Sequence, residues 1–255
     1  MKNRHILTPY FLDQQEPGLE PLAQGDWYLN KPELPEGETQ IRMGTLYQGI
    51  ADFVADASAE GERPISIAGD CCTTIGVLAG LQRAGLDVTL IWFDAHGDFN
   101  TWETSPSGFL GGMPLAMITG RGEQTITGAV GLKSLDDHNV ILTDGRDLDP
   151  GEREALERSS VTHLEDPLML LERALPAGAL YVHFDTDILD PVEAPAMNYL
   201  AEGGPSSHQL ARVFKYLADS SQVAAVSMSS WNPEMDEGGK TEQLCMRLFG
   251  TLAGW

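Results

Sequence analysis

Short apolar runs constrain the fold of this chain more than any other feature of its sequence. They lie at residues 64–68, 88–93, 139–142, 180–184 and 223–228. Runs of this length without polar alternation are typical of parallel strands that are buried on both faces. Stretches with helical spacing flank them, at residues 46–57, 73–84, 150–158, 167–174, 206–217 and 242–252. The alternation predicts an α/β protein, a three-layer α/β/α sandwich with a mostly parallel sheet.

Composition and organisation narrow the class of protein. No linker, repeat or low-complexity tract divides residues 1–255, so we expect a single domain. The formal net charge of −22 argues against nucleic acid and anionic membranes as partners, because like charges repel. No signal-peptide pattern or membrane-length apolar run occurs, and Cys71, Cys72 and Cys245 do not suggest a disulfide framework. We therefore expect a cytoplasmic protein.

Carboxylates follow four of the predicted strands. The segments concerned are residues 69–72, 94–98, 145–152 and 185–191. In open α/β sheets, ligands bind beyond the carboxyl ends of the strands, so these segments should meet at one edge. Carboxylates crowded at one edge repel one another unless protons or cations neutralise them.

Two of these segments have the spacing of metal ligands. In an extended chain, Asp94, His96 and Asp98 point to one side, and Asp185 with Asp187 repeats the pattern from another strand. A lone Asp at such a position is more often a helix N-cap or a turn residue, but the two motifs together favour a metal site. Oxygen ligands with imidazole suit Mn²⁺ and related divalent ions, so the pattern predicts a two-metal centre.

Both motifs resemble those of a known family, the ureohydrolases, which comprise arginases, agmatinases and formiminoglutamases. Residues 94–98 and 185–191 are similar to its two metal motifs, and segments 69–70, 100–101, 107–108, 145–152 and 232–233 extend the similarity in order along the chain. The chain is identified as a divergent arginase-like member. The resemblance implies a metal-dependent hydrolase of a linear amidine or guanidino C–N bond. The implied substrate is an amino-acid-like or modified guanidino compound that yields urea or an amide.

The resemblance also implies roles for individual residues. The metal ligands would be a bridging pair, Asp94 and Asp185, with Cys71 and Asp98 completing one Mn²⁺ site and His96 and Asp187 completing the other. Asp98 would be catalytic as well, orienting the attacking hydroxide. The residues facing the amino-acid end of the substrate would be Asn100, Ser107, Asp149 and Glu152. Family members are often trimers or hexamers, which implies a homo-oligomer.

Three positions depart from the family pattern. Cys71 replaces a metal-binding histidine: a thiolate ligand there would favour Zn²⁺ or Fe²⁺, and the alternative is a buried thiol beside a weakened or empty site. Gly111 stands where arginases carry a histidine thought to relay protons. Ser230 stands where the family has a glutamate that pairs with the guanidinium. Arginine is therefore less expected as substrate than an N-hydroxylated, substituted or formimino compound.

A catalytically silent relative that serves as a binding or assembly subunit is the competing interpretation. The three departures are what such decay would produce. However, a silent protein has no reason to retain a cluster of repelling carboxylates. The intact set of Asp94, His96, Asp98, Asp185 and Asp187 therefore favours an enzyme.

Overall fold

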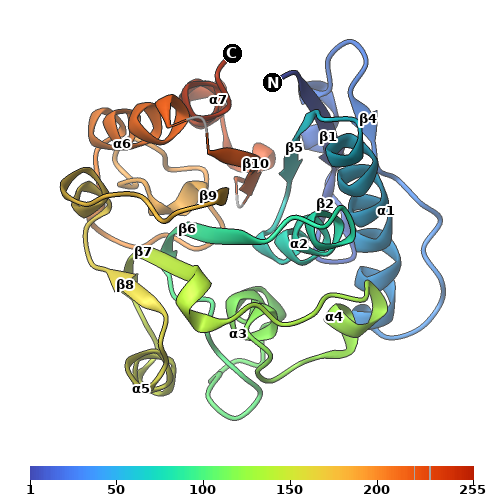
Figure 1. The fold of residues 1–255 in the computed structure, drawn as a ribbon, viewed down its shortest axis with the longest axis horizontal. Coiled ribbons are helices and arrows are strands. Elements are labelled where there is room, and N and C mark those ends of the chain that lie inside the picture. Colours follow the sequence, from blue (N-terminus) through green and yellow to red (C-terminus); the bar gives the residue numbers. More distant parts are fainter. Residues whose placement is uncertain (221, 230) are drawn as a thin grey trace.

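An eight-stranded parallel sheet forms the centre of the computed structural model, which describes residues 1–220, 222–229 and 231–255 (Figure 1). The strand order is β4-β1-β5-β10-β9-β6-β7-β8. The strands are β1 (Asn3–Thr8), β4 (Tyr28–Leu29), β5 (Arg63–Ala68), β6 (Val88–His96), β7 (Val140–Asp147), β8 (Thr162–Leu164), β9 (Ala179–Asp185) and β10 (Val223–Ser229). A separate antiparallel pair, β2 (Tyr10–Phe11) and β3 (Gln14–Gln15), follows β1.

Helices cover both faces of the sheet (Figure 1). One face carries α1 (Thr39–Ala59), α2 (Thr74–Arg83), α3 (Pro114–Ile118), α4 (Thr125–Ala129) and α5 (Pro150–Arg158), and the other carries α6 (Ser207–Asp219) and α7 (Lys240–Ala253). Successive residues of β6 alternate between two apolar cores: Leu90 and Trp92 belong to the first, Ile91 and Phe93 to the second. The predicted three-layer sandwich is confirmed. Among the described helices, none is both long and apolar enough to span a bilayer.

The predicted elements are present with shifted ends, except for one helix. The helix predicted over 167–174 is wrong: a short 3₁₀ helix, Pro167–Glu172, occupies that connection and ends at an extended Arg173. The extended Arg173 ends the helical segment after six residues, and Pro176 follows soon after and does not favour continuing a helix. Strands β1, β4 and β8 of the sheet were not predicted, because β1 begins with polar residues and β4 and β8 are only two and three residues long.

The sheet positions the predicted site. Its strands are parallel, so their carboxyl ends lie at one edge. Strand β6 pairs with β9 on one side and with β7 on the other, while β10 lies between β9 and β5. The segments that follow β5, β6, β7 and β9 therefore meet at that edge.

Candidate active site

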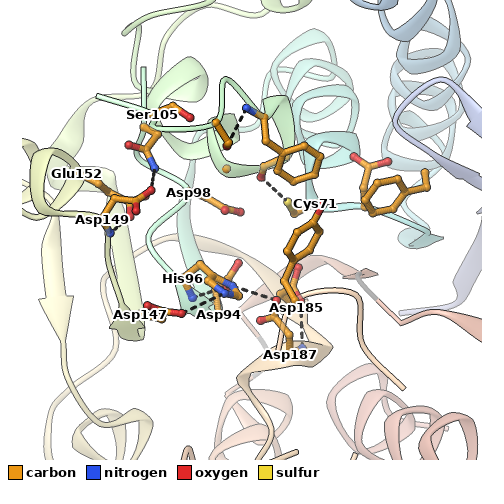
Figure 2. Close-up of a pocket in the computed structure, with 18 residues that line it drawn as sticks. Cys71, Asp94, His96, Asp98, Ser105, Asp147, Asp149, Glu152, Asp185 and Asp187 are labelled. Carbon is orange, nitrogen blue, oxygen red and sulfur yellow. Dashed lines mark hydrogen bonds and ion pairs between the residues drawn. The ribbon is translucent and has the colours of Figure 1, made fainter. Parts of the chain in front are cut away.

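A cavity of about 340 Å³ lies at this edge of the sheet (Figure 2). The residues predicted from the sequence to form a site all line it: Cys71, Asp94, His96, Asp98, Asn100, Ser107, Asp149, Glu152, Asp185 and Asp187. The structure therefore brings together every residue of the predicted site.

Asp94, His96 and Asp187 form the tightest cluster in the cavity. The last residues of β6 supply Asp94 and His96, and the 3₁₀ turn Thr186–Ile188 after β9 supplies Asp187. His96 Nδ1 lies 3.0 Å from Asp187 Oδ2 and 3.3 Å from Asp94 Oδ1. One ligand atom from each of the three residues lies within 4.8 Å of the others, a spacing that suits one metal ion.

Asp98 reaches the cavity by a turn and not by strand alternation. Strand β6 ends at His96, and Asp98 has a φ of +51°, a left-handed conformation that Asp tolerates better than most residues. Its Oδ2 atom is buried and has no hydrogen-bond partner among the described residues. An unpartnered buried carboxylate oxygen is costly unless it meets a proton or a cation. This oxygen therefore fits the presence of a metal ion.

Asp185 ends β9 beside this cluster and is buried. Its Oδ1 accepts a hydrogen bond from the Asp187 amide at 3.1 Å, and its Oδ2 accepts one from Ser229 Oγ at 3.3 Å. The same Ser229 hydroxyl lies 3.2 Å from Nε2 of His183. His183 is fully buried and its Nδ1 lies 2.8 Å from Ser227 Oγ, so it is a hydrogen-bonded core residue.

The pKa values in the cluster show how strongly it retains protons when no metal is bound. Burial raises the pKa of Asp98 well above its usual value, and the charge of Asp94 raises it further. The pKa of Asp187 rises for the same two reasons. Burial lowers the pKa of His96, but its hydrogen bonds to Asp187 and Asp94 outweigh burial and raise it. A metal ion entering the cluster would compete with these protons.

Cys71 lies in the 3₁₀ turn Cys71–Thr73 that follows β5, and it is buried. Its thiol lies 3.3 Å from the carbonyl oxygen of Gly111, to which it donates. A hydrogen bond with Cys72, burial and the charge of Asp98 together raise its pKa. Cys72 instead donates to the Leu110 carbonyl and packs in the core. Cys71 thus lies beside Asp98, where it could complete a second metal site or remain a buried thiol.

Glu152 supports the turn that carries Asp98. Asp149 and Glu152 form a capping box at the start of α5, in which Glu152 Oε2 accepts the Asp149 amide at 3.1 Å. Glu152 Oε1 accepts the Phe99 amide at 2.8 Å. A Cβ atom on Gly97 would lie 2.8 Å from Glu152 Cδ, so only glycine allows this close approach. Both Glu152 oxygens are engaged by backbone amides, so this residue positions the site and adds negative charge to it.

The other residues predicted at the amino-acid end lie near the start of α5. Asn100 Nδ2 donates to Asp149 Oδ2 at 3.0 Å, and Ser107 Oγ accepts the Phe109 amide at 3.2 Å. In Figure 2, Asp149 and Glu152 lie on the side of the cavity opposite Cys71.

Several lining residues were not predicted: Phe11, Asp70, Ser105, Phe109, Gly112, Asp147 and Tyr199. Asp70, Ser105 and Asp147 lie within or next to the motif segments, so proximity in sequence could have indicated them. The aromatic residues come from a two-residue strand and from irregular segments, which are too short for any periodicity to distinguish a lining ring from a packed one. Ser230, singled out from the sequence, lies outside the described residues.

Replacing Glu152 by Gln is expected to remove a pH-dependent loss of stability from the metal-free protein. Burial raises the pKa of Glu152 from 4.5 to about 7, and the charges of Asp149 and Asp94 act in the same direction. The two backbone hydrogen bonds oppose this rise. Between these values the folded state binds more protons than the unfolded state, so the native protein loses stability as pH rises. The total loss is about 3 kcal/mol. Denaturant titrations across this pH range would measure it, and parallel curves for both proteins would contradict it.

Comparison with known proteins identifies the family. A profile of the Arginase family matches residues 33–254. The chain belongs to the arginase family. The family resemblance inferred from the two aspartate motifs is therefore confirmed.

Individual members of the arginase family agree with this assignment. The arginase of Bacillus subtilis (strain 168) is 30% identical over 245 residues, which cover 90% of this chain and 83% of that arginase. The arginase of Brucella melitensis is 33% identical over 224 residues, with coverages of 81% and 72%. A crystal structure of the Bacillus subtilis arginase has a TM-score of 0.85 at 26% identity, covering 100% of this chain and 99% of that chain. The formimidoylglutamase of Bacillus subtilis shares the fold, with a TM-score of 0.73 at 15% identity over 100% of this chain and 87% of that chain.

Proposed function

We propose that this arginase-family protein is a binuclear-metal amidinohydrolase that cleaves a C–N bond of a cationic guanidino or amidino compound. The charge of the cavity carries the proposal: eight carboxyl side chains line it, and no lysine or arginine occurs among its described lining residues. Such a cavity favours cations, either metal ions or a guanidinium-like group, and excludes anions. Family membership supports hydrolysis as the reaction.

The donor set fits two divalent ions. One ion would be held by Asp94, His96 and Asp187, and the second by Cys71, Asp98 and Asp185, with Asp94 and Asp185 shared between them. Carboxylates with one imidazole suit Mn²⁺, while a thiolate would shift the second site toward Zn²⁺ or Fe²⁺. When bound, the ions would lower the pKa of a water molecule toward neutrality and stabilise the negative charge that develops in the transition state.

Asp98 is placed to orient the attacking water. One of its carboxylate oxygens would hold the second ion, and the other can accept a hydrogen bond from that water and then take up a proton. The water oxygen forms a bond to the amidine carbon, the C–N bond to the leaving nitrogen breaks, and both water protons end on the leaving amine. The products are an amine and urea, or an amine and an amide when the substrate is an amidine.

An ammonium group at the other end of the substrate suits the opposite side of the cavity. There the Asp149 carboxylate would pair with the ammonium, beside Asn100 and Ser107. The buried Glu152, which is hydrogen-bonded to the Asp149 amide, would add its negative charge to the attraction for the ammonium. The Asn100 amide and the Ser107 hydroxyl can donate hydrogen bonds to the α-carboxylate of such a substrate. Agmatine keeps the ammonium but lacks this carboxylate, so it should bind less well.

A substrate screen tests the proposed function. We expect N-hydroxyarginine, which keeps the ammonium, to exceed arginine and agmatine in kcat/KM under one metal condition. Formiminoglutamate, whose far end is a carboxylate, tests the formimino alternative in the same screen. Gly111 cannot relay a proton, and Ser230 cannot pair with a full positive charge. Arginine or agmatine at the head of the ranking would contradict this order. Absence of urea, ammonia or amide release from every compound would favour a catalytically silent protein.

Replacing Cys71 by Ala is expected to remove about one metal ion per chain, because the thiolate would complete the second site. The matched control is Cys72→Ala, which removes a neighbouring buried thiol that packs in the core. Elemental analysis of both variants and of the native protein measures the stoichiometry. Replacing Cys71 by His should instead raise Mn²⁺ occupancy. Equal metal content in the native protein and in Cys71→Ala would show that the thiol is not a ligand.

A further inference from the structure

Three aromatic rings form one wall of the cavity, hereafter the aromatic wall: Phe11, Phe109 and Tyr199. The Phe109 ring centroid lies 6.2 Å from that of Phe11, with 16° between the planes, and 5.0 Å from that of Tyr199. Phe11 and Phe109 are only half-buried, and Tyr199 is 47% exposed. The rings therefore contact one another without being enclosed in the apolar core, and they present apolar surface to the cavity.

Gly111 makes room for the central ring of this wall. A Cβ atom at position 111 would lie 2.3 Å from Cε1 and 2.5 Å from Cζ of Phe109. No side chain fits there unless the ring moves. The position at which the resembling arginases carry a histidine is thus covered in this chain by a phenyl ring that comes from two residues earlier. The position of the Phe109 ring therefore depends on the absence of a side chain at Gly111.

The two sides of the cavity differ in chemistry. In Figure 2, Ser105, Asp149 and Glu152 lie on one side and Cys71 on the opposite side, with Asp98 between them. His96 and Asp94 lie below Asp98, and Asp187 lies below Cys71. The Cys71 thiol donates to the Gly111 carbonyl, so the aromatic wall adjoins the Cys71 side. A substrate whose reacting carbon lies over Asp94, His96 and Asp187 would extend one end toward Asp149. Its other end would extend toward the aromatic wall.

We infer that the cavity takes a guanidine or amidine whose outer nitrogen, the one away from the amino-acid arm, carries an apolar substituent that packs on the aromatic wall. The inference rests on the proposed function, because it assumes a reacting amidine carbon over the metal-ligand cluster. Ring faces bind alkyl groups through apolar contact and attract an adjacent cation through their quadrupole. An alkylated guanidinium offers both features. A guanidinium without this substituent would leave the rings of the aromatic wall exposed to water.

The probes for the test are Nω-propyl-L-arginine and L-arginine, compared with the Mn²⁺-loaded protein. We expect kcat/KM to favour the propyl compound by at least about tenfold, since a few buried methylenes in an apolar pocket supply that discrimination. Phe109→Ser should bring the ratio close to one, and Phe109→Leu should retain part of it. Trp102→Ala is the matched control: Trp102 lies in the same loop but does not line the cavity, so the ratio should not change.

A double-mutant cycle separates loss of the wall from general damage to the fold. Gly111→Ala should lower the ratio several-fold by displacing the Phe109 ring, yet have no further effect in the Phe109→Ser background. A ratio near one in the native protein, or an unchanged ratio in Phe109→Ser, overturns the inference while amidine hydrolysis stands. If neither compound is hydrolysed, the proposed function fails. Calorimetric Kd values for the same pair on the loaded protein and on Phe109→Ser then decide whether the wall binds the alkyl group.

Discussion

Replacing Asp98 by Asn is expected to lower kcat/KM by at least about 10³-fold while leaving the fold intact. The variant removes a proposed metal ligand and the group proposed to orient the water, roles that together would supply several kcal/mol of transition-state stabilisation. Asn matches Asp in size and tolerates the φ of +51° at this position. The Oδ2 atom that becomes an amide nitrogen has no hydrogen-bond partner to lose among the described residues. Initial rates at several substrate concentrations measure the effect.

The stability of the same variant provides an internal check. In the metal-free protein, Asp98→Asn should unfold at the same temperature as the native protein or at a higher one, because a buried carboxyl beside Asp94 has been replaced by a neutral group. The matched control is Asp190→Asn, which makes the same change next to β9 but outside the cavity. It should keep full activity. Full activity in Asp98→Asn would exclude Asp98 from catalysis.

Removing the metal is expected to lower the Tm of the native protein by about 10 °C per ion. A ligand that binds only the folded state at 1,000 times its Kd contributes about 4 kcal/mol, and in a chain of this size 1 kcal/mol shifts Tm by about 2–4 °C. The physical source is the cluster of buried carboxylates, whose mutual repulsion the ions relieve. Thermal unfolding before and after chelation, with metal loss confirmed by elemental analysis, measures the shift.

Restoring the ions one type at a time distinguishes the two sites. Mn²⁺ should recover the lost stability in the native protein and less of it in Asp98→Asn, which lacks one ligand. An unchanged Tm after confirmed metal loss would show that the cluster is stable without a cation. Its protons, retained through the raised pKa values of Asp98 and Asp187, would then suffice to neutralise it.

The sequence indicated most of the polar lining of the cavity, because the candidate metal ligands occur at short, fixed spacings directly after apolar runs. Asp94 and His96 lie within the last residues of β6, where alternation applies, and they point into one cavity as expected. Asp98 lies in the same cavity for a different reason, a left-handed turn that Glu152 holds in place. The residue type of Asp98 thus indicated its place in the cavity correctly, although the extended backbone assumed for it was wrong.

The aromatic half was not predicted, and the reason is physical. Phe11, Phe109 and Tyr199 are far apart in the sequence. Phe11 lies in the two-residue strand β2, and the other two lie in irregular segments. An isolated aromatic residue in a loop is compatible with core packing, surface exposure or a binding wall, and only the tertiary structure distinguishes these. Gly111 gave a partial signal as a missing histidine, but its meaning depended on the position of the Phe109 ring.

The position of β10 has a consequence for the order in which the site is assembled during synthesis. Strand β6, which carries Asp94 and His96, pairs directly with β9, which carries Asp185, so these parts can join once residue 185 has left the ribosome. Strand β5, which precedes Cys71, reaches β9 only through β10, at residues 223–229. A nascent chain that lacks β10 thus leaves two strand edges unpaired, a state prone to association with other chains. The side of the cavity that bears Cys71 is therefore completed last, after most of the polypeptide has left the ribosome.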